Sequence, residues 1–187
     1  LGVASPHVID VASAYATFAA NGVYAKPFVV KEVLGANQGV LYESRIQAQQ
    51  VFAPDVMADL TYALQGVVKF GTGTAAANGL GRPAAGKTGT SNDYRDAWFV
   101  GFTPNLLTAV WVGFDNGSSM GLAGSEAALP IWTDFMRQAL GDTPHDSFQV
   151  PPGIWRPCMR AFAGARRIRC FDAVGVEKTP AAGLVPG

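Results

Sequence analysis

The chain has 187 residues, of which 49% are apolar and 15% are charged, a composition typical of a well-packed globular protein. Its 14 basic and 14 acidic residues cancel, so the charge gives no reason to expect nucleic acid or an anionic membrane as the main partner. The longest apolar runs, such as residues 106–114, are too short to span a bilayer. The sequence opens on Leu-Gly-Val-Ala-Ser-Pro without a methionine or a signal-peptide pattern, and we expect it to be the interior of a larger protein.

Apolar residues recur at helical spacing in three segments. The first helix is expected to begin at Ser5-Pro6, a hydroxyl cap followed by proline, and to end at Asn21-Gly22. The second is expected over residues 54–70, and a loop of small residues is expected to follow as far as Pro83. The third is expected over residues 127–140. Its predicted buried stripe consists of Leu129, Ile131, Trp132, Phe135, Met136 and Leu140.

Residues of high strand propensity form two further groups. Residues 28–34 and 40–43 predict a hairpin that turns at residues 36–39. Three strands are then expected at residues 84–90, 97–102 and 107–114, with Trp98 and Trp111 in the core. The connections between these strands are too short for parallel crossovers, so the strands must be antiparallel neighbours. The predicted fold class is therefore α+β, an antiparallel sheet covered by helices.

The composition changes near residue 144, where proline and arginine become frequent. We expect residues 1–143 to form one domain and residues 144–187 to form a peripheral extension. Cys158 and Cys170 lie in this extension, and no histidine lies near them to complete a metal site. The pair favours a small disulfide loop, which places the protein outside the cytoplasm, although two free thiols remain an alternative.

Residues 81–88, with the sequence Gly-Arg-Pro-Ala-Ala-Gly-Lys-Thr, match the phosphate-loop pattern G-x-x-x-x-G-K-[ST]. A phosphate loop must follow a buried strand and open a helix, whose N-terminal amides bind the phosphates. The small-residue segment before the match and Gly89, Asn92 and Asp93 after it fit neither requirement. Nucleotide binding is therefore the less favoured interpretation, and no cofactor or metal is expected.

The favoured interpretation of Lys87-Thr88-Gly89-Thr90 is an edge strand that holds a peptide substrate. Gly89 has no side chain, so an extended peptide can pair with the backbone as an added strand. Lys87 supplies an ammonium group to a cleft, and the hydroxyls of Thr88 and Thr90 suit a carboxylate. The backbone N–H of Thr90 suits an oxyanion.

The sequence resembles class A penicillin-binding proteins, the bifunctional peptidoglycan synthases. Lys-Thr-Gly is the third signature motif of penicillin-binding proteins and serine β-lactamases. Residues 87–104 resemble the third and fourth strands of that family's transpeptidase domain, and residues 107–116 resemble the fifth. Residues 129–136 are similar to the closing helix, and residues 13–22 to the helix before a small hairpin. Because the matches follow the family order over about residues 1–140, the chain is identified as the C-terminal half of such a domain.

The resemblance implies a catalytic role for Lys87 and Thr90 and a substrate-binding role for Thr88, Gly89 and Thr90. The family's nucleophile lies in a Ser-x-x-Lys motif and its proton-relay serine in Ser-x-Asn, but no serine of this sequence has either spacing. We therefore expect a companion N-terminal fragment that carries the nucleophilic serine, since removing a nucleophile removes covalent chemistry.

The implied partners are a peptidoglycan stem peptide and β-lactam antibiotics. The implied location is periplasmic, with the parent protein anchored in the inner membrane by an N-terminal segment that lies outside this sequence. A non-catalytic relative that binds stem peptides or β-lactams remains an alternative, because the deciding motifs lie outside the sequence.

Overall fold

The computed structural model describes residues 5–149, 170–171 and 177–178. The chain divides into two compact units, Leu1–Phe148 and Gln149–Gly187. Within the second unit, strand β8 (Cys170–Phe171) pairs antiparallel with β9 (Glu177–Lys178). Cys158 lies outside the described residues, so its disulfide with Cys170 stays a prediction, as does the domain boundary after residue 143.

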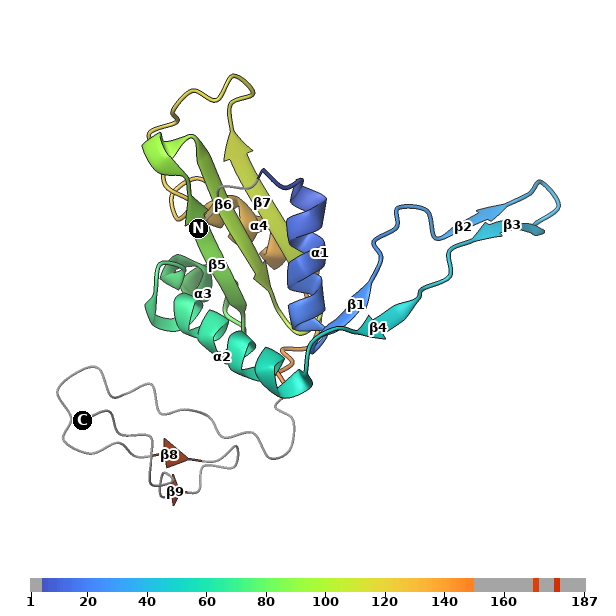
Figure 1. Ribbon diagram of the computed structural model, residues 1–187, viewed down its shortest axis with the longest axis horizontal. Coiled ribbons are helices and arrows are strands. Elements are labelled where there is room, and N and C mark those ends of the chain that lie inside the picture. The colour runs from blue at the N-terminus through green and yellow to red at the C-terminus, as the bar shows by residue number, and fades with distance from the viewer. Residues whose placement is uncertain (1–4, 150–169, 172–176, 179–187) are drawn as a thin grey trace. The chain divides into compact units, whose positions relative to one another are not determined.

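The centre of the first unit is a three-stranded antiparallel sheet in the order β5-β6-β7 (Figure 1). The strands are β5 (Ala85–Thr90), β6 (Asp96–Phe102) and β7 (Leu107–Gly113). Their register aligns Thr88 with Phe99 and Phe99 with Val110. The predicted meander is thus confirmed to within one residue at each strand end.

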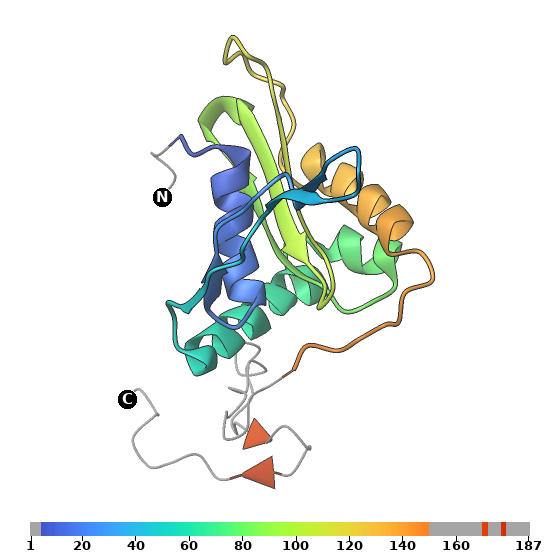
Figure 2. The ribbon, with the colours of Figure 1, turned by 90° about the vertical axis from the view of Figure 1, so that its right-hand side faces the viewer.

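Helix α4 (Ala128–Leu140) covers one face of the sheet, and α1 (Val8–Ala19) covers the other (Figure 2). Trp132 of α4 is completely buried, and its ring packs edge-on against Phe99 with centroids 4.9 Å apart. Its indole Nε1 donates to the carbonyl oxygens of Gly101, at 3.2 Å, and Thr108, at 3.1 Å. The indole therefore satisfies its polar group while filling the core.

The predicted stripe of α4 is correct in part. Trp132 and Met136 are fully buried, but Ile131 and Phe135 are 52% and 50% exposed. Residues 131 and 135 are four positions apart, so they share a neighbouring stripe that points away from the sheet. The other four residues of the predicted stripe are buried, together with Ala128 and Thr133.

Helix α1 begins at Val8, three residues after the predicted start at Ser5. The carbonyl oxygen of His7 accepts the first helical bonds, from Asp10 N at 3.0 Å and Val11 N at 3.2 Å. The helix ends where predicted, because Asn21 and Gly22 have positive φ angles, which Asn and Gly tolerate best.

Helix α2 (Pro54–Phe70) has the predicted bounds, but the segment after it was predicted wrongly. Residues 74–80 form helix α3 (Thr74–Leu80) instead of a loop. The alanines of this segment have the highest helix propensity, and Ala76 and Leu80 are buried in the same core as α4. The neighbouring glycines concealed this short helix in the sequence pattern.

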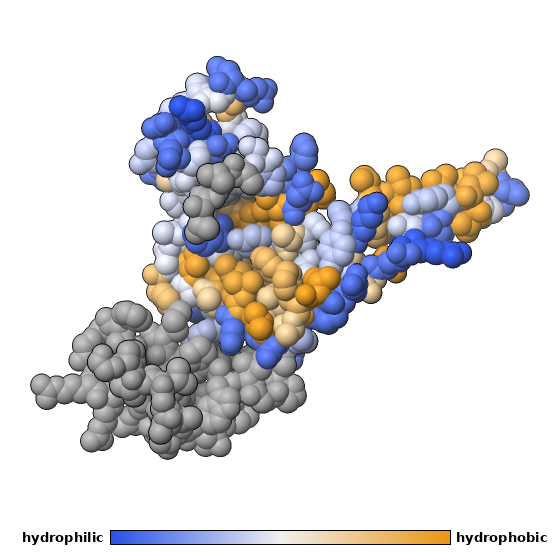
Figure 3. All heavy atoms as spheres, viewed as in Figure 1, coloured by the Kyte–Doolittle hydropathy of each residue, from blue (hydrophilic) through white to orange (hydrophobic). Residues whose placement is uncertain are grey.

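Residues 23–50, here called the arm, extend from the first unit's sheet and helices (Figure 1). Strand β1 (Val23–Ala25) pairs with β4 (Ala48–Gln50), and β2 (Glu32–Leu34) pairs with β3 (Val40–Glu43). The hairpin β2–β3 was predicted, whereas the ladder β1–β4 was missed. Many apolar side chains of the arm are exposed (Figure 3), among them Phe28, Val29, Val30, Leu41, Tyr42 and Ile46.

Candidate functional site

The Lys-Thr-Gly-Thr segment lies in β5, at one edge of the three-stranded sheet. The backbone N–H of Ser91 donates to the carbonyl oxygen of Asp96 at 3.0 Å, immediately after β5. Hydrogen-bonded and non-bonded pairs alternate along an antiparallel ladder. The backbone groups of Gly89 consequently bond to Trp98 of β6, whereas those of Thr88 and Thr90 face the free edge. This edge has the donors and acceptors that an added strand requires.

Lys87 is exposed, and its Nζ donates to the carbonyl oxygen of Thr88 at 2.8 Å. The ammonium group therefore lies along the free edge of β5 and occupies one of the edge acceptors. A peptide that paired with this carbonyl would displace the lysine side chain, which is flexible enough to move.

The hydroxyl groups of Thr88 and Thr90 each contact a segment that lies outside the Lys-Thr-Gly-Thr sequence. Thr88 Oγ1 lies 2.6 Å from Thr72 Oγ1, in the turn between α2 and α3. Thr90 Oγ1 accepts a hydrogen bond from the backbone N–H of Gly124 at 3.0 Å. Since that bond uses only a lone pair of Thr90, its own proton stays available for a ligand. Neither Thr72 nor Gly124 is part of the Lys-Thr-Gly-Thr motif, and these contacts define their place in the site.

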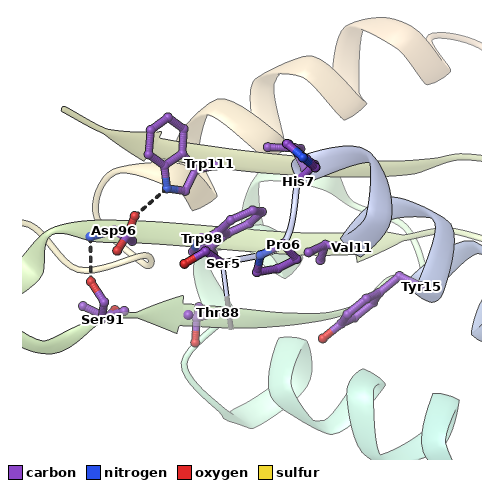
Figure 4. Close-up of a pocket in the computed structure, with 13 residues that line it drawn as sticks. Ser5, Pro6, His7, Val11, Tyr15, Thr88, Ser91, Asp96, Trp98 and Trp111 are labelled. Atoms are coloured by element: carbon purple, nitrogen blue, oxygen red, sulfur yellow. Dashed lines mark hydrogen bonds between the residues drawn. The ribbon is translucent and has the colours of Figure 1, made fainter. Parts of the chain in front are cut away.

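A pocket of about 770 Å³ adjoins the same segment on the α1 side of the sheet (Figure 4). Its lining comes from two parts of the chain. The N-terminal part contributes Ser5, Pro6, His7, Val8, Val11 and Tyr15, and the sheet with its first turn contributes Thr88, Gly89, Thr90, Ser91, Asp96, Trp98 and Trp111. Burial raises the pKa of the Tyr15 phenol above its usual value.

The two tryptophans predicted for the core instead lie in the wall of this pocket. Trp98 is half-buried and Trp111 is 37% exposed, with ring centroids 6.5 Å apart. Trp111 Nε1 donates to Asp96 Oδ1 at 2.9 Å, and the Asp96 N–H donates to Ser91 Oγ at 2.8 Å (Figure 4). The aromatic faces belong to the surface of the sheet opposite α4, which α1 covers only in part.

The phosphate-loop alternative does not fit the structure. Lys87 and Thr88 lie inside a strand, so no helix N-terminus follows them to bind phosphates. Within the part of the chain that the structure describes, no three His, Cys, Asp or Glu side chains are grouped closely enough to hold a metal ion. In the same residues, no helix is long and apolar enough to cross a membrane.

Residues 7–137 match the family described as the penicillin binding protein transpeptidase domain. The chain is 39% identical over 154 residues to penicillin-binding protein 1A of Aquifex aeolicus, a match that covers 81% of this chain and 21% of the relative. It is also 39% identical over 168 residues to penicillin-binding protein 1A of Mycolicibacterium smegmatis, covering 82% of this chain and 21% of that protein. The chain belongs to the penicillin-binding protein transpeptidase domain family, and it spans about a fifth of the length of these curated relatives.

Solved structures agree on the fold. Penicillin-binding protein 1A from Haemophilus influenzae aligns with a TM-score of 0.80 at 24% identity, covering 96% of this chain and 34% of that one. The D,D-transpeptidase domain of a peptidoglycan glycosyltransferase from Eggerthella lenta aligns with a TM-score of 0.57 at 30% identity, covering 74% and 35%. The α+β fold predicted from the sequence is therefore confirmed as part of this family's fold.

Proposed function

We propose that this chain is part of a serine-type D,D-transpeptidase that cross-links peptidoglycan stem peptides and is acylated by β-lactams. One observation carries the proposal: in a member of this family, the Lys-Thr-Gly-Thr sequence forms an edge strand with free backbone groups. An edge strand with hydroxyls at both threonines suits an extended peptide that ends in a carboxylate.

Some residues of β5 bind the substrate, and others take part in catalysis. The hydroxyls of Thr88 and Thr90 bind the terminal carboxylate of the stem peptide, and Gly89 leaves room for its backbone. The N–H of Thr90, which faces the free edge, donates to the oxyanion that forms at the attacked carbonyl. Lys87 joins the hydrogen-bond network of the nucleophile once a peptide has displaced it from the Thr88 carbonyl. No cofactor takes part.

The reaction is an acyl transfer in two steps. A serine hydroxyl attacks the carbonyl between the two D-alanines and its proton passes to a base. The C–N bond then breaks, and the base returns the proton to the terminal D-alanine, which leaves as the amine. An amine of a second stem peptide then attacks the acyl-enzyme ester. The new amide bond is the cross-link, the ester C–O bond breaks, and the proton lost by the amine passes to the released serine hydroxyl. A β-lactam acylates the same serine, because its ring amide takes the place of the peptide bond.

The serine, the base and the Ser-x-Asn hydroxyl belong to a companion segment N-terminal to this chain in the parent protein. Two features can receive it: the outer edge of β7, which pairs with no other described strand, and the pocket beside Thr88–Thr90. The proposed location is the periplasm, with an N-terminal segment anchoring the parent protein in the inner membrane.

Labelling with a fluorescent penicillin tests the proposal. The isolated chain is expected to take no covalent label, and the chain joined to the companion segment is expected to take one label per molecule. In the joined protein, Lys87→Ala should abolish labelling, whereas Lys69→Ala, which changes an exposed lysine at the end of α2, should leave it intact. Stoichiometric labelling of the isolated chain, or unchanged labelling of the Lys87→Ala protein, contradicts the proposal.

A further inference from the structure

Thr72 contacts the proposed carboxylate site without being part of its motif. Its Oγ1 lies 2.6 Å from Thr88 Oγ1, within the usual range for a hydrogen bond between hydroxyl groups. The two residues are 16 positions apart, and they come from different elements. Thr72 lies in the turn between α2 and α3, whereas Thr88 lies in β5.

The turn that carries Thr72 is held firmly on both sides. The N–H groups of Gly71 and Gly73 both donate to the carbonyl oxygen of Val67, at 3.1 and 3.0 Å. A Cβ at position 71 would lie 2.8 Å from Val67 Cα, and a Cβ at position 73 would lie 3.4 Å from the ring of Phe99. Glycine at position 71 therefore lets the turn lie close against α2, and the backbone that carries Thr72 is held in place beside β5.

The contact between Gly124 and Thr90 shows how a donor can direct the proton of a neighbouring hydroxyl group. The N–H of Gly124 can only donate, so it leaves the proton of Thr90 free to point outward. The contact between Thr72 and Thr88 has no fixed direction, because either hydroxyl can donate. A carboxylate only accepts, so Thr88 can serve it only when Thr72 is the donor within the pair.

We propose that Thr72 is a positioning residue for substrate binding: it donates to Thr88 Oγ1 and directs the Thr88 proton to the substrate carboxylate. With Thr72 and Gly124 in place, both threonine hydroxyls of β5 accept from the protein and donate to the ligand. This inference rests on the proposed function of Thr88 and goes beyond it in naming the group that orients its hydroxyl.

The test uses the intact transpeptidase, meaning this chain joined to the segment that carries the nucleophilic serine. The measurement is the second-order rate constant of acylation by benzylpenicillin, which has a free carboxylate, and by its methyl ester, which has none. Thr72→Val removes the hydroxyl and keeps the shape. It should lower the benzylpenicillin rate constant about fivefold, the effect of one neutral hydrogen bond, and leave the ester rate constant unchanged.

Three controls separate orientation from structure. Thr72→Ser keeps the hydroxyl and should retain the benzylpenicillin rate constant within about twofold, less than the worth of one hydrogen bond. Thr74→Val changes the next threonine of the chain, at the start of α3, and should have no effect. In a Thr88→Val background, Thr72→Val should cause no further loss, because the hydroxyl that it orients is gone. The melting temperature of each variant is measured as well, and only variants that melt at the temperature of the unsubstituted protein are compared.

The outcomes distinguish this inference from the function on which it rests. If Thr72→Val leaves both rate constants unchanged, or lowers the ester rate constant as much as that of benzylpenicillin, Thr72 does not orient Thr88. If Thr72→Ser is as impaired as Thr72→Val, the hydroxyl is not the active group. If the unsubstituted protein is not acylated at all, the proposed function itself is wrong, and the role of Thr72 is wrong with it.

Discussion

The sheet and the arm are both antiparallel β-structure, but they are stabilised by different means. In the sheet, β6 is buried along most of its length, and Phe99 and Phe102 are completely inaccessible. In the arm, every residue of β2 and β3 is exposed. Burial holds the sheet together, whereas main-chain pairing and turn geometry define the arm.

The hairpin β2–β3 of the arm is held by its turn and is destabilised by one pair of charges. At the tip, the N–H of Gly35 donates to the carbonyl oxygen of Gly39 at 2.8 Å, and Gln38 adopts a φ of 62°. Glu32 stands directly opposite Glu43, a like-charge pair that destabilises the hairpin. A two-stranded ribbon without a buried face is marginal in water, so the arm should open far more readily than the sheet.

Truncation of the main core residue should give the largest effect. Trp132→Ala removes a buried indole with two hydrogen bonds and should lower the free energy of unfolding by about 3–5 kcal/mol. Urea denaturation of the joined protein measures this loss. Ile131→Ala, on the exposed stripe of the same helix, should change it by less than about 1 kcal/mol. Similar losses in the two variants would show that α4 does not pack as described.

Substitution at the junction between α1 and the arm should give an intermediate effect. Gly22 has a φ of 87°, and an added Cβ would collide with the backbone carbonyl of Phe52. Gly22→Ala should destabilise the protein by more than the roughly 1–3 kcal/mol expected for backbone strain alone. Gly81→Ala is the matched control, because its φ is 68° and nothing lies within 4 Å of the added Cβ. Equal losses in thermal unfolding would argue against the steric contact at Gly22.

Charge reversal in the arm should give the smallest effect. Glu32→Lys replaces the like-charge pair with an opposite-charge pair and should stabilise the hairpin by about 0.2–1 kcal/mol. Amide hydrogen exchange at residues 40–43 should slow, while the urea midpoint of the sheet stays unchanged. Combining Glu32→Lys with Glu43→Lys restores repulsion and should restore fast exchange. If the single change shifted the urea midpoint by several tenths of a molar, the arm and the sheet would unfold as one unit.

The parts of the fold that the sequence revealed are those with strong local signals. Proline and acidic residues at positions 54 and 55 marked the start of α2, and short polar turns marked the meander. Helix α3 was missed because Gly79 and the glycines on either side of the helix argue for a loop, while tertiary packing of Ala76 and Leu80 favours the helix. The ladder β1–β4 was missed because its strands are three residues long and separated by the whole arm.

The candidate site was predictable as a motif and unpredictable as a set of contacts. Lys87, Thr88 and Thr90 stood out because a lysine and two hydroxyls flank a glycine in a predicted strand. The pairing of Thr72 with Thr88 and of Gly124 with Thr90 depends on tertiary contacts over separations of 16 and 34 residues, which no local pattern specifies. Trp111 was misassigned because strand position alone does not tell which face of a sheet a covering helix leaves open.

The ladder between β1 and β4 joins the two segments of the arm next to α1 and α2, and it pairs Val23 with Gln50. The side chain of Gln50 adds a hydrogen bond to the carbonyl oxygen of Asn21 at 2.8 Å. Residues 26–47 begin and end at this ladder, so their length and sequence can change without moving the helices on either side. A longer or shorter segment between β1 and β4 would carry a small entropic cost and would leave the spacing between α1 and α2 unaltered.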